Sequence, residues 1–362
     1  MTSLRVFVDI LTPKQCMLFS KLSERLENEG HQVLKVTREY REVVKLLALK
    51  GVDAKVVGKH GGGTLAGKLR ASAGRVLKLA SLVKEWKPDV AVSFSSPETA
   101  RVAFGLGVPH VCVNDSPHAE AVARLTIPLS KRLLTPKVIP KRAWLSFGIS
   151  ADKIIQYDAL DAWAWLRDFE PNENVLKQLG LDRSKPIITF RTEETFAAYL
   201  LGKTPKKPLV IPIIEKLLEA SQDFQTVVIP RYEKQALALQ EILGKRAVVC
   251  ESIIDGQSLL FFSSIFVGAG GTMTAEAALL GVPTFSCYPD EPFLIEKYLM
   301  NKGLVVRETD PEKAAKKIMR TLSSLESVKT AQEEKARRLA QTFEDPIEVI
   351  ARTIKDVACS SR

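Results

Sequence analysis

The sequence has no long apolar run and no regular grouping of cysteines. None of its apolar stretches reaches the roughly 18 residues that a membrane-spanning helix needs, and its start, MTSLRVFVDI, has the character of a first strand rather than of a secretory signal. The five cysteines are scattered, without a CxxC pair or a Cys/His cluster, which favours reduced thiols in the core. We therefore expect a cytoplasmic protein without a cleaved leader.

The patterns of a metal site are also missing. The chain contains no HxH and no HExxH, and no Asp-x-Asp in a suitable loop. Repeats of solenoid period and low-complexity tracts are absent as well. The sequence thus predicts neither a metal nor any other cofactor, and it argues against a repeat protein.

What the chain does have is length, apolar residues and positive charge. With 362 residues, 46% of them hydrophobic, it can bury more than one sizeable core. Lysine and arginine outnumber aspartate and glutamate by 52 to 42, which gives a net charge of +10. This excess favours anionic partners, such as phosphorylated metabolites, an acidic membrane face or nucleic acid.

Short β-branched runs alternate with longer amphipathic segments, as in parallel sheets joined by crossover helices. We expect strands at 5–10, 32–36, 54–57, 90–94, 110–113, 154–156, 187–191, 225–229, 247–250, 264–268 and 283–287. The alternation weakens between residues 160 and 185, which suggests a linker. The pattern predicts an α/β protein of two Rossmann-like domains, 1–165 and 166–345, with a last helix, 346–362, that could pack back on the first domain.

The most informative segment, SSIFVGAGGTMTAEAALLGVPTFSCYP at 263–289, reads as a strand, a glycine turn, a helix and a second strand. Gly270 and Gly271 permit a tight turn, and a helix that starts near Thr272 offers unpaired amides and a positive dipole end to a phosphate. Thr272 and Glu276 are four residues apart and so share one helix face, where the carboxylate could accept both hydroxyls of a ribose. The alternative is a structural turn with Glu276 on the helix surface.

Several longer motifs extend this pattern over nearly the whole chain. They are DI at 9–10, GKHGGGT at 58–64, SSPETARVAFGLGVP at 95–109, NDSPHAEAVARLT at 114–126, RTEETFAAYL at 191–200, IPRYE at 229–233 and IDGQSLLFFSS at 254–264. In this order they resemble the family called domain of unknown function 354, itself similar to GT-B glycosyltransferases and UDP-N-acetylglucosamine 2-epimerases. The resemblance implies a GT-B fold, in which two parallel sheets face a central cleft.

The resemblance also implies roles for individual residues. The glutamate of the segment G-G-x-x-x-x-E, here Glu276, would bind the ribose, and the nucleotide base would lie against residues 250–253, with Ser252 and Ile253 as contacts. Two departures argue against transferring the epimerase reaction. Epimerases carry His-Arg after the first strand of the second domain, where this chain has Phe190 and Arg191, and they carry an aspartate where this chain has Ser95 or Ser96.

Two arginines follow apolar runs at the carboxyl ends of expected strands. These are Arg191, after PIITF, and Arg231, after TVVIP. Because ligands of open parallel sheets bind at that edge, either guanidinium could bind a diphosphate through its forked donors. The alternative is a surface ion pair with Glu193 or Glu233, two residues further along.

Candidates for proton transfer lie in the amino-terminal half. Asp115 and His118 follow the run HVCV and could approach the same edge as acid and base, although turn chemistry also explains an aspartate there. His60 sits in a glycine-rich loop that could form an anion nest, or in a merely mobile loop. Ser96 could contact substrate or could cap the helix that begins at Pro97. Glu98 and Glu120 are further carboxylate candidates.

The segment 59–87 is basic and amphipathic. Lysines and arginines alternate in it with leucines and valines, against the single acid Glu85. Such a helix could rest on an anionic membrane as a peripheral contact, or it could pack its leucines on the sheet and solvate its lysines. No nucleic-acid module is recognisable, so we do not expect nucleic acid as a partner.

These observations favour a metal-independent transferase of the GT-B type. It would move a sugar from a nucleoside diphosphate donor, with a UDP-sugar favoured, to an acceptor that the sequence does not identify. Gly270, Gly271 and Thr272 would hold the diphosphate together with Arg191 or Arg231, and Asp115 or His118 would activate the acceptor. A nucleotide-sugar epimerase or hydrolase is one alternative, and a non-catalytic nucleotide-sugar-binding protein is another.

Overall fold

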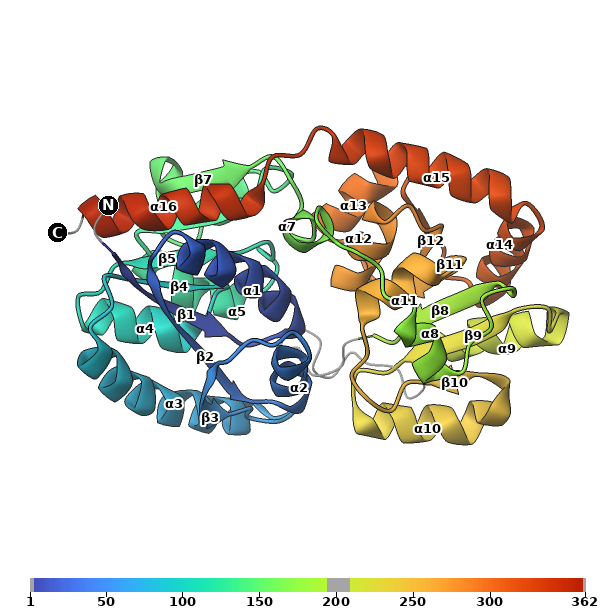
Figure 1. The fold of residues 1–362 in the computed structure, drawn as a ribbon, viewed down its shortest axis with the longest axis horizontal. Coiled ribbons are helices and arrows are strands. Elements are labelled where there is room, and N and C mark those ends of the chain that lie inside the picture. Colours follow the sequence, from blue (N-terminus) through green and yellow to red (C-terminus); the bar gives the residue numbers. More distant parts are fainter. Residues whose placement is uncertain (1–2, 194–208, 361–362) are drawn as a thin grey trace. The chain divides into compact units, whose positions relative to one another are not determined.

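The computed structural model describes residues 3–193 and 209–360 and divides into two compact units (Figure 1). The first unit comprises the described residues up to Trp165 and those from Phe343 onward, and the second comprises those from Leu166 to Thr342. The motif at 191–200 lies outside the described residues from position 194 on.

The first unit is built on a seven-stranded sheet in which all neighbouring strands are parallel, in the order β3-β2-β1-β4-β5-β6-β7. Its strands are β1 (Arg5–Ile10), β2 (Gln32–Glu39), β3 (Lys55–Lys59), β4 (Val90–Ser93), β5 (His110–Val113), β6 (Arg132–Pro136) and β7 (Ile154–Tyr157). Its helices are α1 (Pro13–Asn28), α2 (Arg41–Leu49), α3 (Leu65–Trp86), α4 (Pro97–Gly105), α5 (Glu120–Thr126), α6 (Arg142–Leu145) and α16 (Pro346–Ser360), and α7 (Trp163–Leu166) spans the boundary between the units.

Helices cover both faces of this sheet. On one face α3 packs against α4, and α4 against α5, while on the other α1 packs against α2 and α16. The last helix thus returns to the first unit (Figure 1), where Arg25 pairs with Glu348 and Lys355 with Glu29. Local signals start the helices, because Thr12 caps α1 and Ser96 caps α4, each just before a proline with a helical backbone angle.

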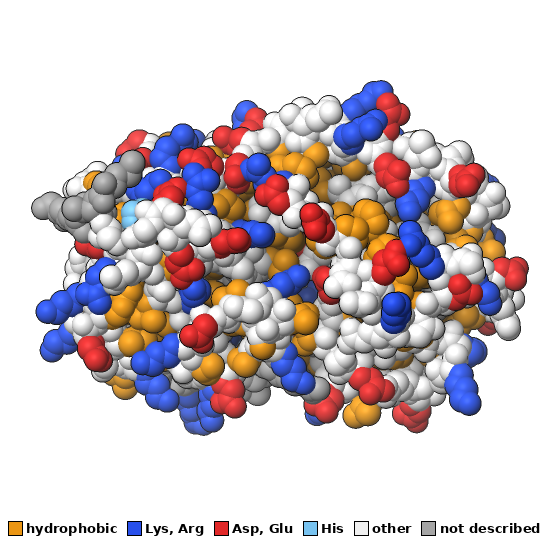
Figure 2. All heavy atoms as spheres, in the orientation of Figure 1, with side chains coloured by type: hydrophobic (Ala, Val, Ile, Leu, Met, Phe, Trp, Pro, Cys, Tyr) orange, Lys and Arg blue, Asp and Glu red, His pale blue; other side chains and the backbone are white. Residues whose placement is uncertain are grey.

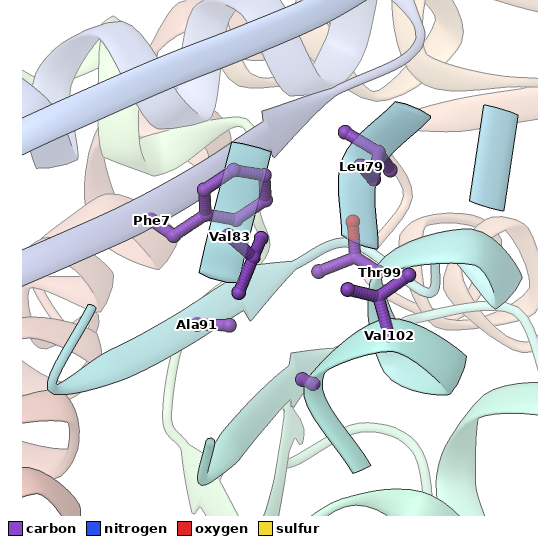
Figure 3. A pocket seen from close by; sticks show the side chains of 7 residues that line it. Phe7, Leu79, Val83, Ala91, Thr99 and Val102 are labelled. Carbon is purple, nitrogen blue, oxygen red and sulfur yellow. The ribbon is translucent and has the colours of Figure 1, made fainter. Parts of the chain in front are cut away.

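Apolar side chains fill the space between α3, α4 and the sheet. Figure 3 shows Phe7, Leu79, Val83, Val102 and Thr99 lining a gap that has no room for a water molecule. These residues come from one strand and two helices far apart in the sequence, so their packing fixes α3 and α4 on the sheet.

The second unit has a six-stranded parallel sheet in the order β10-β9-β8-β11-β12-β13. Its strands are β8 (Ile187–Arg191), β9 (Gln225–Ile229), β10 (Val248–Val249), β11 (Ile265–Gly268), β12 (Thr284–Ser286) and β13 (Val305–Arg307). Its helices are α8 (Asn174–Leu179), α9 (Ile211–Ala220), α10 (Glu233–Leu243), α11 (Gly256–Phe262), α12 (Thr272–Leu279), α13 (Leu294–Asn301), α14 (Pro311–Ser323) and α15 (Leu325–Ala340).

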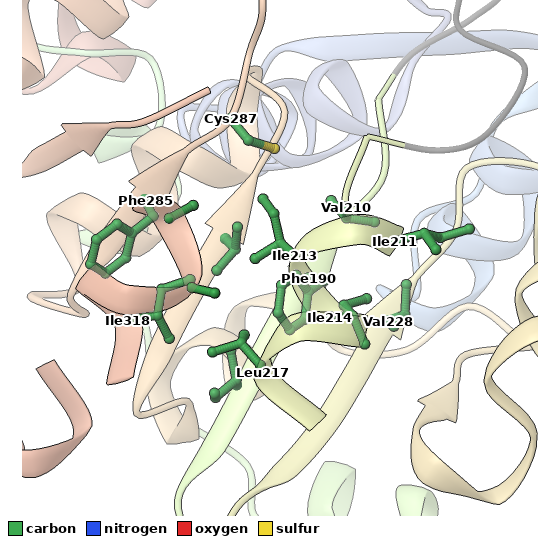
Figure 4. Close-up of a cluster of buried hydrophobic side chains, with 14 of the residues drawn as sticks. Phe190, Val210, Ile211, Ile213, Ile214, Leu217, Val228, Phe285, Cys287 and Ile318 are labelled. Carbon is green, nitrogen blue, oxygen red and sulfur yellow. The ribbon is translucent and has the colours of Figure 1, made fainter. Parts of the chain in front are cut away.

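Neighbouring residues of the central strands belong to separate hydrophobic cores on the two faces of the second sheet. Ile188 and Val228 belong to the core under α9, α10 and α14, which Figure 4 shows with Phe190 and Phe285, whereas Ile187 belongs to the core under α8 and α11. A strand buried on both faces has no polar alternation, which is why these segments read as continuous apolar runs.

Two all-parallel sheets with helices on both faces confirm the predicted fold class of an α/β protein with Rossmann-like domains. The strands at 5–10, 110–113, 187–191 and 225–229 have the predicted bounds, while β6 and β13 are not among the predicted strands. Among the helices that the structure describes, none is long and apolar enough to cross a membrane.

Candidate functional site

The carboxyl end of β11 leads through a glycine turn, residues 269–271, into α12. Gly270 and Gly271 have φ angles of +81° and +95°, in the region that side chains rarely adopt. Gly271 is the N-cap of α12 and has no side chain with which to cap the first amides of this helix. The first turn of α12, including half-buried Thr272, therefore offers N–H donors and a positive dipole end to an anion.

The turn is packed so tightly that only glycine fits at its entrance. A Cβ at Gly268 would lie 2.7 Å from the Phe266 ring and 2.8 Å from the Thr274 hydroxyl. A Cβ at Gly270 would lie 3.6 Å from a carboxylate oxygen of Glu296, on α13. Burial raises the pKa of Glu296, although Ser286 and Arg307 oppose this. The turn therefore has an acidic neighbour that the sequence analysis did not find.

Glu276 lies one turn inside α12, and it is buried rather than on the helix surface. The side-chain amide of Gln257, on α11, donates to its carboxylate at 2.8 Å. This contact holds the carboxylate against α11 inside the second unit. The burial excludes the surface alternative for Glu276.

Both predicted arginines lie beside the turn. Arg191 ends β8 in register with Gly268 of β11, and its guanidinium donates to the Pro230 carbonyl at 2.8 Å. The guanidinium of Arg231 donates through Nε to the Thr192 carbonyl at 3.1 Å, and one of its terminal nitrogens lies 3.3 Å from the place of a Cβ on Gly271. Arg231 thus brings its charge to the mouth of α12, where its fixed cation and the helix start both favour an anion.

Ser252 and Ile253 lie between β10 and α11. Ser252 is exposed and Ile253 half-buried. Their neighbours Cys250 and Ile254 pack in a cluster that Met273, in the first turn of α12, also contacts. The segment therefore lies close to the glycine turn. A segment that contacts the base of a nucleotide bound at this turn would need this proximity.

At the carboxyl edge of the first sheet, Lys14 binds two aspartates. It lies in the first turn of α1 and forms ion pairs with Asp115, which follows β5, and with Asp161, which follows β7. Its ammonium lies 4.5 Å from the centre of the Phe94 ring, and the Tyr157 hydroxyl donates to Asp161. We call Lys14, Asp115, Tyr157 and Asp161 the lysine cluster.

The two aspartates of this cluster ionise differently. Burial acts to raise the pKa of Asp115, but the ammonium of Lys14 outweighs it and holds that pKa below its ordinary value. For Asp161 burial prevails, and the charge of Asp115 adds to it, so the pKa is raised although Lys14 opposes the shift. At neutral pH Asp115 is therefore a carboxylate able to accept a proton, and Asp161 is the first of the two to take one up as the pH falls.

His118 lies near Asp115, close enough for the carboxylate to influence its titration. Partial burial lowers the pKa of His118, Asp115 raises it and Lys14 lowers it, with a net lowering. The imidazole is thus mainly neutral at physiological pH and can accept a proton. The structure brings together the two residues predicted as an acid and base pair, and both favour the role of base.

The remaining predicted residues of the first unit lie in contacts that already explain them. Ser96 is buried and accepts a hydrogen bond from the Thr99 amide as the cap of α4. Its hydroxyl donates to Glu98, which is buried and lies 4.0 Å from Arg75. Glu120 pairs with Arg124 on the surface.

His60 stacks on Tyr40 with ring centres 4.7 Å apart, and its Nδ1 accepts from the Gly62 amide. Burial, with the charges of Arg38 and Lys68, lowers the pKa of His60 to about 4. It is therefore a neutral imidazole with its proton on Nε2. A pKa this low does not favour His60 as a group that gains and loses a proton near neutral pH, the role for which it was a candidate. Gly61 of this loop has a packing reason, since a Cβ there would lie 2.4 Å from the backbone of Lys68.

Sequence reasoning missed the charged partners of both edges. Lys14, Asp161 and Glu296 were not considered, nor was the pair of Arg75 with Asp9, in which the guanidinium donates to both carboxylate oxygens at 2.9 and 2.6 Å. The sequence did contain a signal for Lys14. A cation in the first turn of a helix is unfavourable next to the positive end of the helix dipole, so a nearby anion could have been predicted. No local signal marks Asp161, which lies 147 positions from Lys14 (161 − 14).

Residues 4–358 match the family model described as Protein of unknown function (DUF354). The uncharacterised protein MJ0665 of Methanocaldococcus jannaschii is 35% identical over 315 residues, which cover 86% of this chain and 89% of that protein. The chain belongs to the DUF354 family.

Solved structures show the fold of this DUF354 protein. The UDP-GlcNAc 2-epimerase from Neisseria meningitidis bound to UDP-GlcNAc matches with a TM-score of 0.74 and 16% identity, covering 97% of this chain and 100% of that one. A glycosyltransferase from Rickettsia africae matches with a TM-score of 0.64 and 12% identity, covering 100% and 99%. These likenesses confirm the predicted GT-B class of fold for the DUF354 chain.

Proposed function

We propose that this protein binds a nucleoside diphosphate sugar, with a UDP-sugar favoured, and transfers the sugar to a hydroxyl acceptor without a metal ion. The observation that carries the proposal is the glycine turn at the mouth of α12, with the guanidinium of Arg231 beside it and the buried carboxylate of Glu276 one turn inside. Backbone amides and a fixed cation suit a diphosphate, and the carboxylate suits the two hydroxyls of a ribose.

The first unit would supply the base. Asp115, kept ionised by Lys14, could take the proton of an acceptor hydroxyl as it attacks the sugar. The leaving diphosphate would be stabilised by the first turn of α12 and by Arg191 or Arg231, which replaces the charge that a metal would provide. His118 is the alternative base.

A nucleotide-sugar epimerase or hydrolase is the second candidate. It is favoured by the unequal aspartates of the lysine cluster, since one carboxylate with a lowered pKa and one with a raised pKa could remove a proton and return one. The likeness to an epimerase bound to UDP-GlcNAc agrees with this candidate. Phe190 stands where epimerases carry a histidine, which weighs against it.

Nucleotide binding is tested by the rise in melting temperature with UDP, UDP-GlcNAc and other nucleoside diphosphate sugars, because a ligand that binds the folded state stabilises it by mass action. We expect a rise with a UDP-sugar, and a fall in affinity of about tenfold or more in Glu276→Gln, which replaces one acceptor of a ribose hydroxyl. The matched control is Glu241→Gln, an exposed position of α10 in the same unit. An unchanged ligand response in Glu276→Gln would show the ribose contact to be wrong.

Product analysis separates the candidates. A transferase forms a new glycoside only when an acceptor is present, whereas an epimerase or hydrolase changes the donor alone, as mass spectrometry and NMR would show. If a UDP-sugar binds but is not converted with any acceptor of a broad panel, the third alternative holds, a nucleotide-sugar-binding protein without catalysis.

A further inference from the structure

The helix α3 exposes its leucines instead of packing them on the sheet. Leu65, Leu69 and Leu77 are 69%, 71% and 73% exposed. Together with Ala73 they are spaced by four residues, so they form one ridge along the helix. Three widely exposed leucines in one line are unusual on a soluble surface, where large apolar residues are normally scattered singly.

A basic ridge runs beside the apolar one. Arg70 and Lys78 are exposed and each follows a residue of the leucine ridge by one position, while Lys84 continues the exposed charge toward the end of the helix. Only Glu85 carries a negative charge on α3. The neighbouring edge strand β3 adds exposed Val56 and Lys55. Figure 2 shows orange and blue side chains next to one another over the part of the first unit where α3 lies.

The buried side of α3 explains why the helix keeps this arrangement. Leu79 and Val83 belong to the core against the sheet, and Arg75 is held by Asp9 and by the Val57 carbonyl. The helix is thus fixed to the sheet without any contribution from Leu65, Leu69 and Leu77. Their exposure is a property of the folded unit. The ridge winds around α3 by about 40° at each four-residue step, so that Leu77 lies opposite the buried side, while Leu65 is exposed at the start of the helix.

We propose that this face of α3 docks the protein on an anionic lipid bilayer. A ridge of leucines beside a ridge of lysine and arginine matches the acyl boundary and the phosphate headgroups of such a surface, and the net charge of +10 attracts the whole chain to it. The occupant is chosen by charge complementarity. The residues of this surface belong to the first unit, whereas the glycine turn belongs to the second. If the proposed function holds, docking would place acceptor or product at a membrane.

The test is cosedimentation of the full chain with vesicles of phosphatidylcholine alone and of phosphatidylcholine with roughly one third phosphatidylglycerol. We expect binding to the anionic vesicles and at least about tenfold weaker binding to the neutral ones. Leu65→Gln/Leu69→Gln/Leu77→Gln should reduce binding by about tenfold or more, and Arg70→Gln/Lys78→Gln by roughly 25-fold, since each basic residue near the surface contributes about fivefold.

The matched control is Leu237→Gln/Lys234→Gln on α10, where Leu237 is 62% exposed and Lys234 is exposed too. It should bind like the wild type, and the melting temperatures of all variants should stay close to that of the wild type, since the substituted side chains are exposed. Absence of binding to anionic vesicles, or equal binding by the leucine variant, would overturn the proposal. So would a dimer, seen by light scattering, that the leucine variant converts to a monomer, because a second copy would then cover this face.

Discussion

The two units have the same construction and different chemistry at the carboxyl edges of their sheets. In the first unit this edge holds charged side chains in buried ion pairs, Arg75 with Asp9 and Lys14 with two aspartates. In the second it holds a glycine turn, a helix start and arginines whose donors go to backbone carbonyls. All four histidines of the chain also lie in the first unit, at positions 31, 60, 110 and 118. The first edge therefore depends on the pairing of charges, whereas the second depends on backbone geometry.

The largest effect is expected from the buried pair of the first unit. Arg75→Met would leave the carboxylate of Asp9 buried without its cation, which should lower the free energy of unfolding by about 3–5 kcal/mol in urea titrations. Arg70→Met, five residues earlier on α3 and exposed, should change it by less than about 0.5 kcal/mol. Equal effects of the two substitutions would mean that the pair is not what stabilises this edge.

The pH dependence of stability should also originate in the first unit. Burial lowers the pKa of His110 from 6.5 to about 4. The unfolded chain therefore takes up a proton below pH 6.5 while the folded chain does not, so stability falls as the pH drops from 6.5 to 4, by up to roughly 3 kcal/mol for this residue. In His110→Gln that share of the loss should disappear from urea titrations at a series of pH values, whereas His118→Gln, which leaves His110 in place, should keep it.

In the second unit, backbone geometry should be the sensitive feature. Gly268→Ala would press a methyl group against the Phe266 ring and Thr274, at a cost of about 1–3 kcal/mol in unfolding free energy. As the control, Gly74→Ala meets no atom within 4 Å and lies inside α3, so it should stabilise the first unit by about 0.5–1 kcal/mol. A neutral Gly268→Ala would show that the turn has room to relax.

The smallest effect on stability is expected at Ser96, where a substitution tests whether this residue only caps α4 or also binds substrate. Loss of the cap in Ser96→Ala should lower the unfolding free energy by about 1 kcal/mol, with Ser81→Ala on the surface of α3 as the control. If Ser96 only caps α4, the rise in melting temperature with a UDP-sugar stays the same in the variant. A reduced rise would instead place Ser96 in the binding site, as the sequence analysis proposed.

Local sequence patterns were sufficient to predict much of the fold. They were also sufficient to predict the glycine turn at the carboxyl edge of the second sheet. The strands β8 and β9 were found because both of their faces are buried and most of their residues are apolar or β-branched. The glycine turn was found because its residues are consecutive, so that strand, turn and helix start are visible in one stretch of sequence. The short strand β13 was missed because only one of its three residues is buried, so its segment has little apolar pattern.

The sequence by itself determined the alternation of strands and helices, the glycine turn before α12 and the excess of positive charge. Only the tertiary structure decided which charges meet, because Lys14 reaches Asp115 and Asp161 through the order of strands in a sheet and not through nearness in the chain. It also decided that the leucines of α3 face outward, since periodicity alone shows that a helix has an apolar ridge and cannot show which ridge the sheet covers.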